Sequence, residues 1–200
     1  MLTQLATVKA RLGVLDTDTQ YDDLLTRAIE AVGARFDREC NRTLARVAGA
    51  TQEFPATEVE IVARCYPVET VTKFELKTSE ADGWVEQAGA AYVVLGGCVI
   101  SLNAPLAMVF EASRAGPRVA RVTYTGGYVV PGAAPTAGQT ALPADLESAA
   151  VEQVAVWFQQ RDMLGLTHHW PKDGIYLAFS QLPLLAQVTA MLRPYRRWCV

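Results

Sequence analysis

Residues 143–163 read PADLESAAVEQVAVWFQQRDM, the stretch with the clearest helical pattern in the chain. Pro143 suits the first position of a helix, because its ring fixes a helical φ angle and its missing N–H would have no partner there. Apolar residues then recur at helical spacing, at Leu146, Ala150, Val154, Trp157 and Phe158. We therefore predict an amphipathic helix over 143–163, with both aromatic residues in the hydrophobic core.

Three further helices are predicted from the same periodicity. Thr3 is a candidate cap for a helix over 3–13, which Gly13 would end. A longer helix over 19–40 follows Asp18 or Thr19 and ends near Asn41, a residue that tolerates a left-handed backbone. Its apolar face comprises Leu24, Leu25, Ala28, Ile29, Val32 and Phe36. The last helix is predicted over 183–192, between two prolines.

Between residues 43 and 128 the pattern changes to short runs rich in Val, Ile, Thr and aromatic residues, separated by Gly and Pro. Phe74 and Leu76 alternate with charged residues, which indicates a strand with one buried and one solvated face. Gly96-Gly97 between two apolar runs predicts a hairpin. The last long strand is expected over 118–124. This region predicts a small antiparallel β-sheet.

The fold class predicted is therefore α+β, with about four helices packed with a small antiparallel sheet in a single domain over 1–192. Two hundred residues, half of them hydrophobic and a fifth charged, are enough for one such core. Residues 129–142 are mainly small residues with Pro and Gly, and we expect a mobile loop there. Residues 193–200 follow the last helix and form a C-terminal arm.

Composition limits the partners of the protein. A formal net charge of −3 argues against tight binding of nucleic acid, which needs clustered Lys and Arg. The four cysteines are scattered without zinc-ligand spacing, so reduced thiols are expected. The chain shows neither a signal peptide nor a long apolar run, so we expect no membrane partner and an intracellular protein.

No catalytic, cofactor or metal site is predicted. The run from Asp16 to Asp23 begins like a calcium loop, but Tyr21 stands where that loop needs Gly and Arg27 where it needs Glu. We interpret it as a loop that caps the following helix. His168 and His169 are the only histidines, and adjacent side chains do not point at one metal without an unusual backbone. Phosphate-binding loops, nucleophile elbows and zinc-protease motifs are also missing from the sequence.

The C-terminal arm is the one candidate binding site. Arginine and aromatic residues are common anchors of protein interfaces, and both kinds gather beyond the last helix. The alternative is a frayed, solvated terminus. The candidate residues are Arg193, Tyr195, Arg196, Arg197 and Trp198.

Several segments together resemble the head-tail connector or adaptor proteins of tailed bacteriophages and gene transfer agents. The matching segments, in the family's order and spacing, are LATVKARLGV, DDLLTRAIEAVGARFDRECNRTL, RCYPVETVTKFEL, VTYTGGY and LPADLESAAVEQVAVWFQQRD. They cover most of residues 2–164, and LLAQVTAMLRPYRR is similar to the family's closing helix and tail. The stretches 129–142 and 164–174 depart from the family's pattern.

The resemblance implies helices beside a small sheet, and a ring of about a dozen copies beneath the portal protein in the virion. Double-stranded DNA would pass through the ring without sequence-specific binding, and the arm would bind the portal. A head-closure (stopper) or tail protein would be the next partner, and assembly would take place in the bacterial cytoplasm. Family members are not known as enzymes.

Two other functions stay open. The first alternative to the adaptor is a tail-completion or head-closure component of the same particle. A small-molecule enzyme with a cleft between sheet and helices, using His168, Asp162 or Glu152, is the alternative from another class.

Overall fold

The computed structural model describes residues 1–106, 118–161 and 184–197. The chain divides into two compact units. The helical unit comprises Met1–Cys40, Val130–Gly132 and Leu142–Arg196, and the β unit comprises Asn41–Val129, Ala133–Ala141 and Arg197–Val200. The α+β fold class is confirmed, while a single domain over 1–192 stays a prediction.

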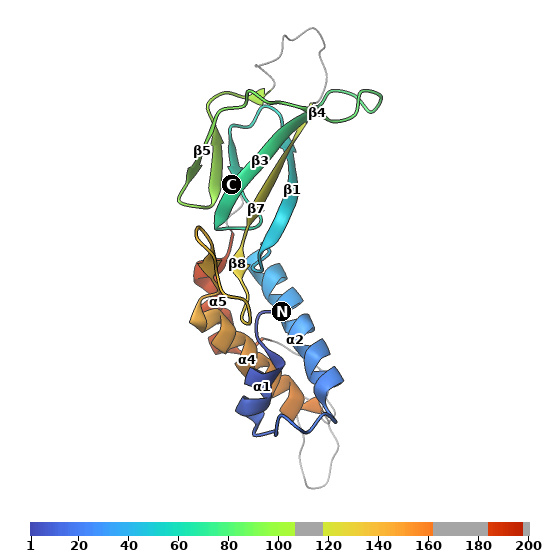
Figure 1. Cartoon of the computed structure of the whole chain (residues 1–200), viewed down its shortest axis with the longest axis vertical. Coiled ribbons are helices and arrows are strands. Elements are labelled where there is room, and N and C mark those ends of the chain that lie inside the picture. Colours follow the sequence, from blue (N-terminus) through green and yellow to red (C-terminus); the bar gives the residue numbers. More distant parts are fainter. Residues whose placement is uncertain (107–117, 162–183, 198–200) are drawn as a thin grey trace, which may run out of the picture. The chain divides into compact units, whose positions relative to one another are not determined.

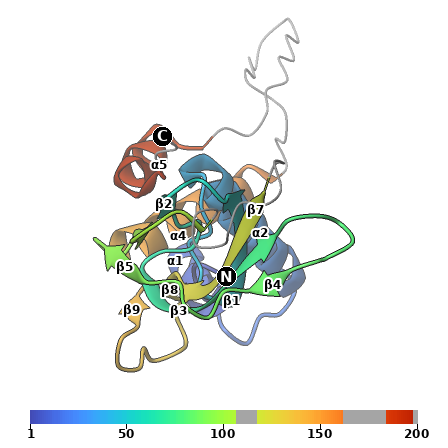
Figure 2. The ribbon, with the colours of Figure 1, turned by 90° about the horizontal axis from the view of Figure 1, so that it is seen from above.

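The helical unit contains four α-helices among the described residues (Figures 1 and 2). They are α1 Leu5–Leu12, α2 Asp22–Cys40, α4 Ala144–Gln159 and α5 Ala186–Leu192, followed by the short 3₁₀ helix η2 Arg193–Tyr195. Their inward faces form one apolar core, as the periodicity predicts. Its fully buried members include Val8, Leu25, Val32, Phe36, Leu146, Val154, Val188 and Leu192.

Both left-handed helix ends are confirmed, at Gly13 with φ 69° and at Asn41 with φ 51°. The predicted starts are less accurate. Gln4 and not Thr3 precedes α1, because Thr3 is buried and gives no capping hydrogen bond. Pro143 lies one residue before α4.

The start of α2 also differs from the prediction, since the helix begins at Asp22 and not at residue 19. Residues 16–21 form the turns that lead into it, and the backbone N–H of Asp22 donates to the carbonyl of Thr19 over 3.2 Å. On this helix Leu24 is 47% exposed and does not belong to the core. The last helix, predicted from residue 183, begins at Ala186.

The aromatic pair of α4 lies at the edge of the core and not within it. Trp157 and Phe158 are both half-buried. The ring of Phe158 meets the ring of Tyr21 edge-on, with centroids 5.2 Å apart, and the guanidinium of Arg161 lies 4.4 Å from the Phe158 centroid. Phe158 is therefore packed against Tyr21 and Arg161 at one end of the helical core, and it is not fully buried.

The described residues of the β unit form two antiparallel sheets and one short parallel pair, where the sequence predicts one antiparallel sheet. The four-stranded sheet has the order β1-β7-β3-β4 and the three-stranded sheet the order β2-β6-β5. Apolar side chains of both, including Phe54, Phe74, Val122, Ile61 and Ile100, form one core. The strands are β1 Val47–Pro55, β2 Glu60–Val62, β3 Val68–Lys77, β4 Val85–Glu86, β5 Tyr92–Leu95, β6 Val99–Leu102 and β7 Val119–Gly126.

The Gly96-Gly97 hairpin is confirmed. It joins β5 to β6, and both glycines have positive φ angles, 55° and 68°, which suit glycine. The stretch 129–142 is not loop throughout, because β9 Thr140–Ala141 pairs in parallel with β8 Tyr128–Val129. Backbone pairing therefore orders part of a segment whose side chains bury little.

The alternation in β3 is confirmed for Phe74 and Leu76, but Glu75 between them is also buried, at 6% exposure. Its carboxylate accepts hydrogen bonds from Lys73 Nζ over 3.0 Å and Arg121 Nε over 2.9 Å. The Arg121 guanidinium in turn lies 4.3 Å from the centre of the Trp84 ring. The face of β3 that was predicted to be solvated thus carries an ion-pair network in which the Glu75 carboxylate is shielded from water.

Acid titration is expected to weaken this network. Burial raises the pKa of the Glu75 carboxyl, but the hydrogen bonds from Lys73 and Arg121 outweigh burial and bring the pKa below its usual value. The network therefore stabilises the fold above a pH of about 4.3, and this contribution is lost as the pH falls through the lower pKa of the folded state.

We expect Glu75→Gln to lower the free energy of unfolding at pH 7 by about 1 kcal/mol, a figure discounted for the solvent exposure of Lys73 and Arg121. Urea unfolding at pH 7 and pH 3 checks this, and the difference from the unsubstituted protein should shrink at pH 3. Glu86→Gln, at an exposed carboxylate opposite Glu75, is the control. An equal loss at both pH values would contradict the account.

Candidate functional site: the C-terminal arm

The helix that leads into the arm is anchored in the helical unit. Gln153 of α4 is fully buried, and its Oε1 accepts the backbone N–H of Leu185 over 2.9 Å. Val188 and Leu192 of α5 are buried, and the Cys40 thiol donates to the Leu192 carbonyl over 3.9 Å. The arm therefore starts from a fixed point.

Two arm residues bind other parts of the helical unit. The Tyr195 hydroxyl lies 2.8 Å from both carboxylate oxygens of Asp145, at the start of α4. Arg196 forms an ion pair with Glu39 near the end of α2. Arg193 is exposed to solvent. Residues 195 and 196 are thus held by acidic partners and are not a frayed end.

Arg197 belongs to the β unit, where its Nη2 donates to the carbonyl of Val62 over 2.8 Å. It lines a cavity of about 510 Å³ between β1 and β2. Apolar side chains and charges of both signs line it. The lining includes Phe54, Ile61, Val62, Glu53, Glu58, Glu60 and Arg64.

A buried tyrosine supports the wall of this cavity. The Tyr124 hydroxyl accepts the backbone N–H of Arg64 over 2.9 Å and that of Cys65 over 3.1 Å, and donates to Gln52 Oε1 over 3.3 Å. Burial raises the pKa of Tyr124, so its hydroxyl keeps its proton at neutral pH. The arrangement binds and positions backbone, and it offers no nucleophile paired with a base.

The acidic run before α2 holds a lysine ammonium. Lys9 is 3% exposed, and its Nζ donates to the carbonyls of Asp16 and Asp18 and to Asp22 Oδ1, over 3.0, 2.6 and 2.8 Å. Asp22 and Asp23 lie in the first turn of α2, as the capping interpretation predicts. The acidic run therefore neutralises a buried lysine ammonium.

The residues considered for catalysis are not brought together in the described ranges. Glu152 lies on α4 and forms an ion pair with Arg11 over 3.0 Å. Asp162, His168, His169 and the arm residue Trp198 lie outside the described residues. Residues 1–106, 118–161 and 184–197 contain no group of three or more His, Cys, Asp or Glu side chains that could hold a metal ion.

Cys40, Cys65 and Cys98 of the described ranges are reduced thiols, while Cys199 lies beyond those ranges. In the same ranges we find no helix of the length and apolarity that a membrane span requires.

Sequence reasoning missed the partners of the arm. Asp145 and Glu39 look like ordinary helix-surface acids, and only the fold brings them to Tyr195 and Arg196. Arg42 was also missed. It is buried, donates to the Tyr66 carbonyl, and stacks on the Tyr66 ring at 3.2 Å. The position of Arg42, between the end of α2 and the first strand, was the one sequence feature that could have indicated a structural role for it.

Comparison with known proteins finds no matching family model and no matching curated protein. Solved structures do match. One is a chain in the neck of an empty gene transfer agent particle with C6 symmetry, at a TM-score of 0.57 and 17% identity. Another is a chain in the virion of a native gene transfer agent particle, at a TM-score of 0.53 and 19% identity. Each match covers 98% of this chain and 89% of the other.

The likeness shows the fold. With 17% and 19% identical residues, the similarity lies in the arrangement of helices and strands, and it covers nearly the whole chain.

Proposed function

We propose that the protein is a structural head-tail adaptor (connector) subunit of a tailed phage or gene transfer agent particle. Copies form a ring beneath the portal, link capsid to tail, and let double-stranded DNA pass. The observation that carries this proposal is the fold shared over 98% of the chain with a chain from the neck of a gene transfer agent particle. The ordered sequence segments that resemble the adaptor family support it independently.

The C-terminal arm is the part proposed to bind the portal protein. Arg193 is exposed and positioned by η2, directly after the anchored α5, so its guanidinium is available to an acidic group of a partner. Tyr195, Arg196 and Arg197 would exchange their present oxygen partners for oxygens of the portal. Trp198 would fill an apolar pocket there.

The charge of the chain suits a conduit. A net charge of −3 gives no broad attraction for phosphates, so DNA would slide through the ring without being held. The next partner along the axis would be a head-closure (stopper) or tail protein.

Removing residues 193–200 is expected to leave a folded subunit that no longer attaches to the portal. The cores of both units lie outside these residues, so the circular dichroism spectrum should be unchanged. Attachment is measured by pull-down with the portal protein encoded beside this chain. Normal attachment of the truncated chain would overturn the role of the arm.

A point variant keeps the test informative if the truncation, which removes the contacts of Tyr195 and Arg196, destabilises the subunit. Arg193→Glu reverses an exposed charge and removes none of the hydrogen bonds described for the arm. We expect about tenfold weaker attachment, while Arg38→Glu, at an exposed arginine of α2, should attach normally. Recovery with the tail tube and not with the portal would favour a tail-completion or head-closure component.

A further inference from the structure

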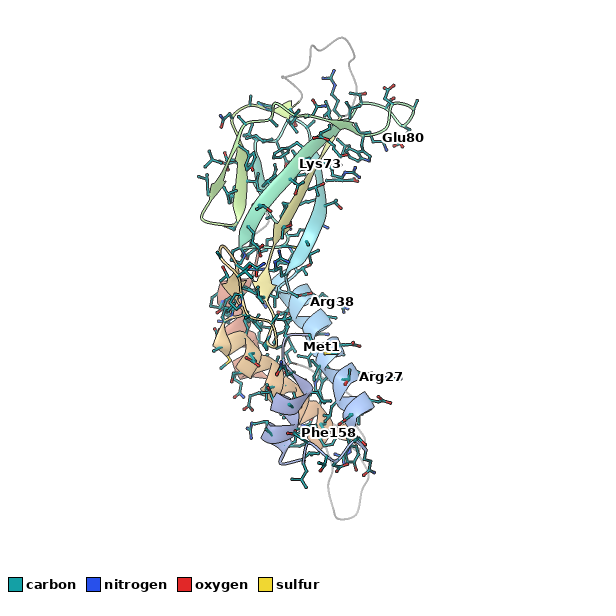
Figure 3. The ribbon with its side chains drawn as sticks, viewed as in Figure 1. Met1, Arg27, Arg38, Lys73, Glu80 and Phe158 are labelled. Atoms are coloured by element: carbon teal, nitrogen blue, oxygen red, sulfur yellow. The ribbon has the colours of Figure 1, made fainter. Side chains whose placement is uncertain are left out.

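The outer side of α2 is exposed and combines an apolar residue, a cation and small residues. Leu24, Arg27, Ala31 and Ala34 lie three or four positions apart, so they share one face of the helix. All four are exposed. Figure 3 shows the side chain of Arg27 on the side of α2 that is turned away from α4. An exposed leucine next to alanines, where a helix can be approached closely, is a surface suited to packing.

A groove lies between α1 and α4 in the same helical unit. Its volume is about 440 Å³. Small, apolar and charged side chains line it. The residues lining it are Thr7, Arg11, Ala144, Glu147, Ser148, Val151 and Glu152.

Charge distinguishes Glu147 from the other acid of this groove. Glu152 is already paired with Arg11 over 3.0 Å. Within the part of the chain that the structure describes, neither Glu147 nor Arg27 forms an ion pair. Each is therefore an unneutralised charge beside a packing surface, and the two signs are opposite.

The spacing of the two surfaces matches when the helices run antiparallel. Along α2, Leu24, Arg27 and Ala31 are three and four residues apart, about 10 Å in all at 1.5 Å per residue. Along α4, Val151, Glu147 and Ala144 are four and three residues apart, which gives the same length. This alignment sets leucine against valine, cation against carboxylate, and alanine against alanine.

We infer that the outer face of α2 packs into the α1–α4 groove of a second copy of this chain. The two surfaces differ, so the contact is heterologous, and repeating it adds copies in one direction until a ring closes. The inference rests on the proposed function for its setting in a particle. The contact itself is testable without the portal.

The test joins the two surfaces by a disulfide. A chain carrying Ala31→Cys and Ala144→Cys is concentrated and oxidised, and its products are separated by size without reductant. A head-to-tail contact lets each copy bond to two neighbours, so we expect a ladder of dimers, trimers and larger species. The parent chain, with its own cysteines, is the baseline. Absence of a ladder above that baseline would overturn the inference, and so would dimers alone, because they indicate an isologous contact.

Charge reversal then tests the pairing of Arg27 with Glu147 in the same disulfide background. Arg27→Glu or Glu147→Arg alone should reduce the ladder about tenfold or more, because like charges then meet. Both changes in one chain should restore it, and so should an equal mixture of the two single variants, in which unlike copies alternate. Arg38→Glu is the matched control, because Arg38 is also exposed and lies eleven residues further along α2 than Arg27 (Figure 3). In the antiparallel alignment this position falls beyond the start of α4.

A ladder that Arg27→Glu leaves unchanged would refute this contact. A charge-dependent ladder from a chain that does not attach to the portal would support the contact and count against the proposed function. Complete rings on the portal formed by the Arg27→Glu chain would instead support the function and refute the contact.

Discussion

Replacing Phe36 by alanine is expected to lower the free energy of unfolding by about 3–5 kcal/mol. The ring is fully buried on the inner face of α2, the helix that packs against α1, α4 and α5. Alanine would remove those contacts and leave a cavity that the packed helices do not fill. Urea unfolding followed by circular dichroism at 222 nm, a helix-sensitive wavelength, measures the change.

The control for this substitution is Leu15→Ala. Leu15 is 74% exposed, so its removal should change the free energy of unfolding by no more than about 0.5 kcal/mol. A loss below about 1 kcal/mol for Phe36→Ala would mean that this helical core is not packed as described.

Replacing Gly127 by alanine is expected to cost about 3 kcal/mol or more, because two obstacles coincide there. Its φ angle is +102°, which side chains rarely adopt. An added Cβ would also lie 2.6 Å from the carbonyl oxygen of Ala45 and 2.9 Å from the Cα of Arg46. Both are backbone atoms, so the segment between β7 and β8 would have to shift.

Hydrogen exchange of the amides of β7 is the direct measurement, since protection there should fall with the stability of the β unit. Gly89→Ala serves as control, because an added Cβ at Gly89 meets nothing within 4 Å and its φ is not positive. Equal protection in the Gly127→Ala and Gly89→Ala chains would contradict the close approach at Ala45.

The helices could be predicted because each buries one face, and burial of one face gives the apolar spacing of the sequence. Their ends were harder. Thr3 is of a capping type, yet it is buried, and Gln4 takes the position before α1. Leu24 was assigned to the apolar face of α2 but is exposed on the outer side of the helix. Composition and spacing alone do not show whether such a residue is covered by a neighbouring element.

The β region shows a different limit. The Gly96-Gly97 hairpin is local, so its turn residues suffice to predict it. The pairing of β7 with both β1 and β3 joins segments far apart in the chain, and alternation indicates which face is buried but not which strands are neighbours. Two sheets therefore replace the single predicted one.

Buried charges were not predictable from spacing. Glu75 is neutralised by Arg121, 46 residues away, and Lys9 by oxygens of the acidic run. In each case the buried charge is stabilised by groups that the fold brings to it, from other elements or from the following loop. The arm illustrates the same point, since its residues were predicted as a binding segment but the acids that hold Tyr195 and Arg196 were not.

Imaging the purified chain together with the portal protein encoded beside it tests the adaptor role most directly. Negative-stain particles of the eluted complex should show a second ring stacked on the portal, with an open centre. Intact portal rings that carry no second ring, in the presence of folded chain, would contradict the proposal that this protein is a portal-bound adaptor.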